Sequence, residues 1–296
     1  MCGCAVPMKR IFVTGWGGFV GTYLGNYLAQ RGHQVLAVTR LKNIAMQQSL
    51  HGLIELFNVD INDLSQLPKG IDLVIHIAAS LPHDGQKNTN YIRDNILATE
   101  KLIQLALRSQ IRKFIYFSTV SVCGNIQGPV IDEKTPIINP DAYGLSKLFG
   151  EYNLMELSDQ LPSLTLRLPA IVGYGAKGHW LATVIDKALK NKKIHIFNAS
   201  SLFNNAVHIQ DLCFFIETLF SQSFLGAQCI TLASEGGLTI KSIAEKIKKL
   251  THSSSEIIEV QNKQTPFKIS IEKAKSHFNF IPRDFASTLE LYLNDL

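Results

Sequence analysis

The sequence predicts an α/β fold: a doubly wound parallel sheet with a smaller C-terminal lobe. Three observations predict it. A glycine-rich junction lies near the N-terminus, short apolar runs alternate with amphipathic helical patterns, and the alternation becomes less regular after about residue 173. At 296 residues and 46% hydrophobic content the chain can bury a large core. We expect a main domain over residues 8–172 and a lobe over 173–296, from which strands can return to the main sheet.

The glycine-rich junction is the most informative segment. An apolar run ending at Thr14 is followed by Gly15, Gly18 and Gly21, and an amphipathic helical pattern continues beyond them. A sharp turn between a strand and a helix, with free N–H groups at the positive end of the helix dipole, suits a diphosphate. An ordinary glycine-rich loop could show the same spacing, but its place at the first strand–helix junction favours a dinucleotide site.

The remaining elements follow in regular order. Near-continuous apolar runs predict buried parallel strands, and periodic patterns between them predict helices. The predicted strands of the main domain are Lys9–Thr14, Gln34–Thr39, Leu53–Asn58, Leu73–Ile77, Lys113–Ser118 and Ser163–Leu168, and its clearest helices are Asn88–Arg108 and Asp141–Leu157. In the lobe we expect strands at Ile194–Phe197 and Cys229–Leu232 and helices at Ile209–Phe220 and Thr239–Leu250.

Composition excludes several classes of protein. The net charge of +5 comes from scattered lysines, which favours solvated helix faces over a nucleic-acid surface. No apolar run approaches the ~20 residues that span a bilayer. Five cysteines are an odd number and do not form a disulfide framework, and no metal-ligand pattern is evident. We therefore expect a cytoplasmic protein with neither a metal site nor a membrane partner.

The individual cysteines support the same interpretation. Cys123 and Cys213 lie in apolar contexts that predict buried thiols. Cys2 and Cys4 precede Met8, which resembles a natural start directly before the first strand, so we interpret residues 1–7 as an extended or alternative N-terminus. These residues lack the pattern of a secretory signal.

Two positions bear on the choice of cofactor. Where an acidic residue would accept the ribose 2′-OH of NAD, after the second strand, this chain has Arg40, whose guanidinium could hold a 2′-phosphate. This pattern favours NADP, with NAD possible, although Arg40 could also be a solvated strand-end residue. Asp60, after the third strand, could accept from adenine or cap the helical turn that begins near Asn62.

Tyr143 and Lys147 are the strongest catalytic candidates. They lie at i and i+4 on one predicted helix, and Tyr143 is the only one of eight tyrosines with a lysine four residues later. A nearby ammonium would favour the phenolate and bring proton transfer into the neutral range. Ser118 and Thr119 end the fifth predicted strand, where a hydroxyl could donate to a substrate oxygen, and the residues alone leave the choice between them open.

These motifs, in this order, resemble a family. The segment from Thr14 to Gly21, His76-Ile77-Ala78-Ala79, Asn95, Ser118-Thr119 and Tyr143-x-x-x-Lys147 are similar to an extended short-chain dehydrogenase/reductase of the NAD-dependent epimerase/dehydratase group, much of which acts on nucleotide-linked sugars. The resemblance implies a Rossmann domain over 8–172, a mainly substrate-binding lobe over 173–296, and a homodimer formed by the two long helices.

The resemblance also implies roles for individual residues. Thr119, Tyr143 and Lys147 would be catalytic. The cofactor would be bound by Gly15, Gly18, Phe19, Val20, Gly21, Arg40, Asp60, Ile61, Ala78, Ala79, Ser80, Asn95, Tyr143, Lys147 and Pro169. The substrate, a nucleotide-sugar or another small carbonyl compound, would meet Ser80, Thr119, Ser121, Tyr143 and Lys177.

Departures from the family pattern narrow the reaction. Val120-Ser121 replace the Asp-Glu of sugar 4,6-dehydratases, so dehydration is disfavoured, and Asn204-Asn205 replace an arginine that often grips the substrate diphosphate. The loop Gly173–Gly178 resembles that of short 4-keto-sugar reductases of surface polysaccharide synthesis. The expectation is an NADP(H)-dependent reductase of a 4-keto nucleotide-sugar. The alternatives are an NAD-dependent nucleotide-sugar 4-epimerase and a non-catalytic dinucleotide-binding regulator.

Overall fold

The computed structural model describes residues 7–40, 52–83, 85–260 and 265–296. The segment with Cys2 and Cys4 lies outside these residues. Contacts divide the chain into two interleaved units. The first comprises Met1–Gly124, Asn139–Arg167 and Cys213–Ile230, and the second comprises Asn125–Ile138, Leu168–Leu212 and Thr231–Leu296. The chain therefore crosses between units several times, where the sequence suggested one boundary after residue 172.

A seven-stranded sheet organises the first unit and confirms the predicted fold class. Its order is β12-β7-β5-β4-β1-β2-β3, and the pairs β1–β2, β2–β3, β1–β4 and β4–β5 are parallel. The strands are β1 (Arg10–Thr14), β2 (Gln34–Thr39), β3 (Ile54–Asn58), β4 (Leu73–His76), β5 (Phe114–Thr119), β7 (Ser163–Leu168) and β12 (Ala227–Thr231). Strand order reverses at β1, between β2 and β4, which is where doubly wound folds bind ligands.

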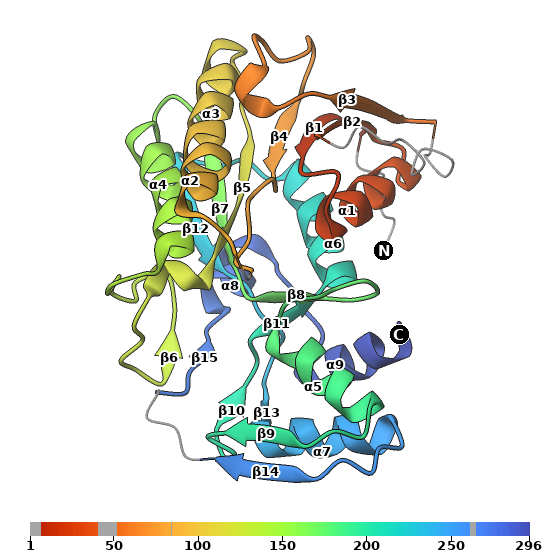
Figure 1. The fold of residues 1–296 in the computed structure, drawn as a ribbon. Helices are drawn as coiled ribbons and strands as arrows, with labels where there is room; N and C mark the ends of the chain where they lie inside the picture. Colours follow the sequence, from red (N-terminus) through yellow and green to blue (C-terminus); the bar gives the residue numbers. More distant parts are fainter. Residues whose placement is uncertain (1–6, 41–51, 84, 261–264) are drawn as a thin grey trace. The chain divides into compact units, whose positions relative to one another are not determined.

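Helices cover both faces of this sheet (Figure 1). The helical elements are α1 (Phe19–Gln30), α2 (Asn88–Asn90), α3 (Ala98–Arg108), α4 (Ala142–Glu156) and α6 (Ile209–Thr218). Figure 1 shows α3 and α4 side by side on one face and α1 with α6 on the other. The core under α3 and α4 is apolar and completely buried, with Phe12, Val74, Leu102 and Phe114 at its centre. Burial of these side chains is the main force that holds helices and sheet together.

Two elements of the structure differ in detail from those predicted from the sequence. The segment predicted as one helix over Asn88–Arg108 contains a π-helical stretch, Tyr91–Leu97, between α2 and α3. Such widened turns are often found at functional sites, and this one directs two adjacent side chains to the same target, as described below. The strand predicted at Cys229–Leu232 is β12, and it joins the edge of the main sheet.

The described residues of the second unit form short strands and helices. Its strands are β6 (Val130–Ile131), β8 (Ala170–Val172), β9 (Ile194–Phe197), β10 (Leu202–Phe203), β11 (Ala206–His208), β13 (Leu238–Thr239), β14 (Ile257–Val260) and β15 (Lys268–Ile269), paired as β6–β15, β8–β11, β9–β14 and β10–β13. Its helices are α5 (Trp180–Leu189), α7 (Ile240–Leu250), α8 (Glu272–Phe278) and α9 (Phe285–Asn294). Aromatic contacts such as Trp180 on Phe203 and Phe203 on Phe285 hold it together.

The structure also bears on the cysteines, on membrane spans and on metal ligands. Cys123 and Cys213 are buried thiols, as predicted. None of the described helices combines the length and the apolar character that a membrane span needs. Within the same residues, His, Cys, Asp and Glu side chains form no group of three able to hold a metal ion.

A line of large apolar side chains remains exposed on the π-helical stretch and α4. These residues are Ile92, Leu97, Leu145, Phe149, Tyr152 and Met155, and their exposed fractions range from 41% to 61%. Solitary exposed apolar residues are common, but a continuous line along adjacent helices marks a contact surface. We propose that a second copy of the chain covers it through a two-fold contact.

We expect light scattering at micromolar concentration to give twice the chain mass of 32.9 kDa. Replacing both Leu145 and Met155 with glutamate should give a monomer, because two carboxylates would be buried in the contact. Replacing Leu225 with glutamate should leave the mass unchanged, because this side chain is still more exposed, at 83%, and lies elsewhere in the first unit. A monomer in the parent protein would refute the proposed dimer.

Candidate active site

The glycine-rich turn has the geometry of a phosphate site. Gly15 has φ of +84°, and a Cβ there would lie 2.8 Å from the backbone nitrogen of Ala78, whereas a Cβ at Gly21 would collide with the Gly15 carbonyl. Gly18, the N-cap of α1, is different because a Cβ there would meet only the Gly15 oxygen, at 3.5 Å. Backbone packing therefore requires the first and third glycines, while the second leaves room above the N–H groups that open α1.

A buried hydrogen-bond chain fixes the end of β4 against this turn. The Thr14 hydroxyl oxygen accepts the backbone N–H groups of Ile77 and Ala78, both at 3.1 Å. Its own hydrogen is then left for Nδ1 of His76, at 2.7 Å, so the His76 proton lies on Nε2 and is donated to Thr99 at 2.8 Å. Complete burial lowers the pKa of His76 well below its usual value, which keeps the ring neutral. His76 is thus a structural residue.

Ser80 and Asn95 join the end of β4 to α4, the helix that carries Tyr143 and Lys147. The Asn95 side chain accepts the Ser80 N–H at 2.7 Å and donates both to the Ser80 carbonyl and to the hydroxyl of Ser146 on α4, at 3.1 and 2.8 Å. The Ser80 hydroxyl donates to Asp94 at 2.7 Å. The widened helix Tyr91–Leu97 lets the consecutive residues Asp94 and Asn95 both reach Ser80.

The two candidate hydroxyls at the end of β5 have different environments. Ser118 is buried and donates to Glu151 on α4 at 2.5 Å, so its hydroxyl is committed to the interior. Thr119 follows it, accepts the backbone N–H of Ser121 at 3.2 Å and donates to the Ser121 hydroxyl at 3.2 Å. Thr119 is the last residue of β5, and its hydroxyl bonds into the turn that follows. Of the two hydroxyls, that of Thr119 is therefore the one at the carboxyl end of the strand, where open α/β sheets bind ligands.

Tyr143 is brought to the same place by the start of α4. Asp141 caps the helix by accepting the Gly144 N–H at 2.7 Å. The first turn packs so closely on the turn after β5 that a Cβ at Gly144 would lie 2.5 Å from the Ser121 carbonyl. Burial raises the pKa of Tyr143, and the neighbouring Tyr91 and Asp141 raise it further. The sequence predicted that Lys147 would lower this pKa, but its ammonium lies against another ring.

Lys147 is a buried cation without a hydrogen-bond partner among the described residues. Its side chain is 1% exposed, and Nζ lies 4.2 Å from the ring centroid of Tyr116. Burial lowers its pKa to about 7, although the nearby Glu151 acts in the opposite direction. Buried donors normally have partners, so this ammonium is suited to a ligand hydroxyl, such as those of the nicotinamide ribose.

Replacing Lys147 with methionine should stabilise the protein when no dinucleotide is added. The folded protein binds fewer protons than the unfolded chain between pH 7 and the usual lysine pKa of 10.5. The cost of burying the amine is therefore greatest at and below pH 7 and falls as pH rises. Methionine should raise the free energy of unfolding in urea by on the order of 2 kcal/mol at neutral pH, with a smaller gain at alkaline pH.

Lys113 provides the matched control. It is also partly buried with a lowered pKa, but its Nζ donates to three carbonyls, of Leu219, Phe220 and Gln222. Lys113→Met should therefore destabilise the protein, because it leaves those carbonyls unpaired. If Lys147→Met does not raise the free energy of unfolding at neutral pH, the Lys147 ammonium has a hydrogen-bond partner in solution.

Arg40 belongs to a cluster of charges at the carboxyl end of the sheet. Its guanidinium lies 2.8 Å from Asp94 and 3.9 Å from Asp60, while Arg93 lies 2.5 Å from Asp60. Asp60 also caps the helical turn by accepting the Asn62 N–H at 3.0 Å. Burial alone would raise the pKa of Asp60, but these hydrogen bonds and the two arginines outweigh it and lower the pKa. The capping role is thus observed, and Arg40 is ion-paired as well as half-exposed.

Other sequence-predicted residues occupy consistent but less informative positions. Phe19 and Val20 open α1, Ala79 follows β4, and Ile61 is buried after the Asp60 cap. In the second unit, Pro169 separates β7 from β8, and Lys177 is exposed in the loop before α5.

Asn204, one of the two residues in the place of a substrate-gripping arginine, has an internal role. It is buried, donates to the carbonyls of Ser234 and Ile269 and accepts the Ile269 N–H.

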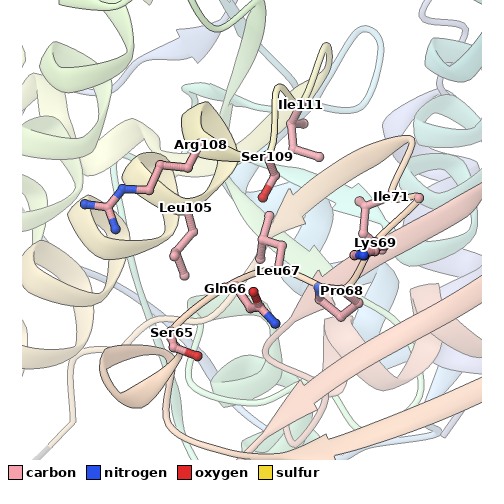
Figure 2. A pocket seen from close by; sticks show the side chains of 11 residues that line it. Ser65, Gln66, Leu67, Pro68, Lys69, Ile71, Leu105, Arg108, Ser109 and Ile111 are labelled. Atoms are coloured by element: carbon pink, nitrogen blue, oxygen red, sulfur yellow. The ribbon is translucent and has the colours of Figure 1, made fainter.

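A pocket of about 590 Å³ lies away from these residues. The loop Ser65–Ile71, before the amino end of β4, and the C-terminal end of α3 form it, and Figure 2 shows their side chains around it. No residue predicted for the site lines it. Since open α/β sheets bind ligands at the carboxyl ends of their strands, we do not assign the active site to this pocket.

Comparison with known proteins identifies the family. Residues 11–227 match the model of the NAD dependent epimerase/dehydratase family. The chain belongs to this family. Relatives include the UDP-N-acetyl-alpha-D-glucosaminuronate decarboxylase of Bacillus cytotoxicus, 27% identical over 85% of this chain and 83% of the relative. An uncharacterized UDP-glucose epimerase of Bacillus subtilis is 26% identical over 91% and 92%. The UDP-glucuronic acid 4-epimerase of Bacillus cereus, solved with NAD, has a TM-score of 0.82 at 22% identity, covering 96% and 95%.

Membership in the epimerase/dehydratase family makes this chain an enzyme of the short-chain dehydrogenase/reductase type that uses a nicotinamide dinucleotide. Three residues that contact predicted site residues were not anticipated from the sequence: Asp94, Tyr116 and Glu151. Glu151 lies four residues after Lys147, on the same helix face, and that spacing could have identified it. Asp94 immediately precedes Asn95, but nothing in the sequence shows that it meets Arg40, 54 positions earlier.

Proposed function

We propose that this enzyme is an NAD-dependent nucleotide-sugar 4-epimerase. The observation that carries the proposal is that one unit combines the glycine-rich turn, the Thr119 and Tyr143 hydroxyls and the unpaired Lys147 ammonium. These are the groups that reversible oxidation of a secondary alcohol needs: a dinucleotide site, a proton acceptor and donor, and a donor to the substrate oxygen. The residues fit the cofactor because Gly18 leaves space for a diphosphate and Lys147 has a donor to offer.

Each residue then has a defined role. When bound, NAD supplies the hydride acceptor and donor. The Tyr143 oxygen takes the proton of the sugar hydroxyl during oxidation and returns it during reduction. The Thr119 hydroxyl donates a hydrogen bond to the same sugar oxygen, where negative charge develops. Lys147 binds the ribose through its ammonium, which has no hydrogen-bond partner among the described residues.

Epimerisation is favoured over net reduction by the state of Arg40. The reductase expectation relied on an arginine available for a 2′-phosphate, and in the structure that arginine is ion-paired with Asp94. The curated epimerase and decarboxylase relatives act on UDP-linked sugars by name, which supports the nucleotide-sugar class. Reduction of a 4-keto nucleotide-sugar with NADPH is the second candidate, because the Arg40 side chain is 52% exposed.

The test combines cofactor identification with product analysis. The purified protein is denatured, and the released dinucleotide is identified by mass spectrometry. The protein is then incubated with UDP-glucose, UDP-glucuronic acid and UDP-N-acetylglucosamine, and C4 configuration is followed by NMR. We expect retained NAD and C4 inversion without net change in nicotinamide absorbance. Stoichiometric NADPH consumption with a 4-keto sugar would establish the reductase, and dinucleotide binding without turnover of any sugar would indicate a regulator.

A further inference from the structure

Arg40 follows the strand that contacts the phosphate-binding turn. Strands β1 and β2 are paired with Thr14 opposite Val38, and Trp16 in the turn donates its N–H to the Val38 carbonyl at 3.1 Å. Arg40 is two residues beyond Val38, at the carboxyl end of β2. In doubly wound folds this position meets the adenosine ribose of a bound dinucleotide. The charge that Arg40 presents there therefore bears directly on discrimination between a ribose hydroxyl and a ribose phosphate.

Asp94 neutralises that charge from a different part of the chain. Its carboxylate is 12% exposed and lies 2.8 Å from Arg40, and its second oxygen accepts the Ser80 hydroxyl at 2.7 Å. Ser80 is itself held by Asn95 through two hydrogen bonds. The acid is thus fixed in position by the end of β4 and by the widened helical turn, and it does not depend on the arginine for its orientation.

The four charged side chains form one cluster that carries no net charge. Arg93 lies 2.5 Å from Asp60 and 3.5 Å from Asp94. Arg40 lies 2.8 Å from Asp94 but 3.9 Å from Asp60, so Asp94 is the nearer partner of Arg40. Two arginines and two aspartates sum to zero. A 2′-phosphate would bring close to two negative charges to a cluster that already contains two carboxylates, and binding it through Arg40 would require that the Asp94 pair be broken.

We infer that Asp94 is a specificity-determining residue: by pairing with Arg40 it makes the site select NAD over NADP, although no acid follows β2 in the sequence. The inference rests on the proposed function, because it requires that a nicotinamide dinucleotide occupy this turn. It explains how a chain with arginine at the position typical of NADP sites can belong to a family that uses NAD.

The test is a competition between the two cofactors. Full-length protein is equilibrated with excess NAD and NADP in equal amounts and separated from unbound nucleotide, and the ratio of the two released cofactors is measured by mass spectrometry. Molecules that fail to fold retain neither cofactor and do not affect the ratio. We expect the parent protein to retain mainly NAD and Asp94→Asn to move the ratio about tenfold toward NADP, the factor that 1.4 kcal/mol represents. Asp63→Asn, which removes an exposed acid from the nearby helical turn, should change the ratio less than about twofold.

A double-mutant cycle connects the effect to Arg40. Arg40→Gln should change the ratio less than about threefold in the parent, where the arginine is already neutralised, and should cancel the gain in the Asp94→Asn protein. A tenfold loss of NADP from Arg40→Gln alone would show that Arg40 acts as an available cation, and this would overturn the inference. So would a parent that prefers NADP, or an Asp94→Asn ratio equal to the parent's. Should Asp94→Asn retain neither cofactor, the Arg40→Gln result decides.

The two proposals fail in different ways. If the parent retains neither NAD nor NADP, the proposed function is wrong, and the inference about Asp94 falls with it. If the parent retains NAD and epimerises a sugar but the Asp94→Asn ratio is unchanged, only the inference is wrong.

Discussion

Replacing Tyr143 with phenylalanine should lower turnover by about 10²–10⁴-fold or more, the range typical of general acid–base catalysis, while dinucleotide retention is unchanged. Phenylalanine preserves the ring, its contact with Tyr91 at 5.9 Å between centroids, and the packing of α4 on the turn after β5. Only the hydroxyl that moves the proton is lost. We expect the loss in kcat, because the proton is transferred only in the reacting complex.

Steady-state kinetics and the retained-cofactor measurement together check this prediction. Tyr152→Phe is the matched control, because it removes a hydroxyl from an exposed tyrosine of the same helix and should leave kcat unaltered. Near-normal turnover of Tyr143→Phe with cofactor still bound would show that another group carries the proton. Loss of cofactor together with turnover would instead indicate that the phenol helps to hold the dinucleotide.

The elements of the main sheet could be predicted because each is decided by local patterning. Buried parallel strands are apolar along their length, and β2 and β7 have the predicted bounds, Gln34–Thr39 and Ser163–Leu168. The glycine-rich turn could be predicted for a similar reason, since it depends on backbone geometry that only glycine provides at Gly15 and Gly21. Features of this kind can be predicted because they depend only on residues that are close together in the sequence.

What could not be predicted depends on residues that are distant in sequence. Arg40 and Asp94 are 54 positions apart in the sequence. Their ion pair neutralises the arginine, which the sequence alone predicted to be a phosphate ligand. The Lys147 ammonium was expected near Tyr143, its neighbour one helical turn away, but it lies over Tyr116 of β5. The widened turn Tyr91–Leu97 has an ordinary helical pattern, and only its contacts with Ser80 account for it.

The division into units was equally beyond local patterns. The chain passes from the first unit to the second after Gly124 and returns at Asn139. β12 joins the edge of the main sheet with residues from the predicted lobe, a return that the prediction from the sequence allows. The assignment of dinucleotide binding to the main domain and of substrate binding mainly to the lobe stays a prediction.

Removing the carboxylate of Glu151 should be the most destabilising single change in the site. Glu151 is buried on α4 and accepts hydrogen bonds from Arg167 of β7, at 2.8 Å for the Nη2 contact, and from Ser118 of β5. Although burial alone would lower the pKa of Arg167, the bonds and charge of Glu151 raise it, so the guanidinium stays charged. Glu151→Gln would leave that buried charge uncompensated, at a cost of about 3–5 kcal/mol in the free energy of unfolding.

A second variant separates stability from electrostatics. Glu151→Leu combined with Arg167→Met replaces the ion pair with apolar side chains. The free energy of unfolding of this double variant should lie within about 1–2 kcal/mol of that of the parent, because buried ion pairs can often be replaced by apolar side chains at little cost in stability. Both variants, however, remove the negative charge that raises the pKa of Lys147. The pKa of Lys147 should therefore fall in Glu151→Gln. If the neutral amine of Lys147 is the active form, the acidic limb of the pH–kcat profile should move to lower pH. If the charged ammonium is the active form, activity at neutral pH should fall.

Urea unfolding and pH–rate profiles of the parent and the two variants decide the matter. If the double variant recovers stability but retains the altered profile of Glu151→Gln, then Glu151 tunes Lys147 in addition to holding β7, β5 and α4 together. If the double variant restores both stability and the parent profile, the carboxylate serves only to compensate Arg167. If the free energy of unfolding of Glu151→Gln lies within about 1 kcal/mol of that of the parent, the buried ion pair is contradicted, because a buried guanidinium without a counter-ion destabilises a protein by more than that.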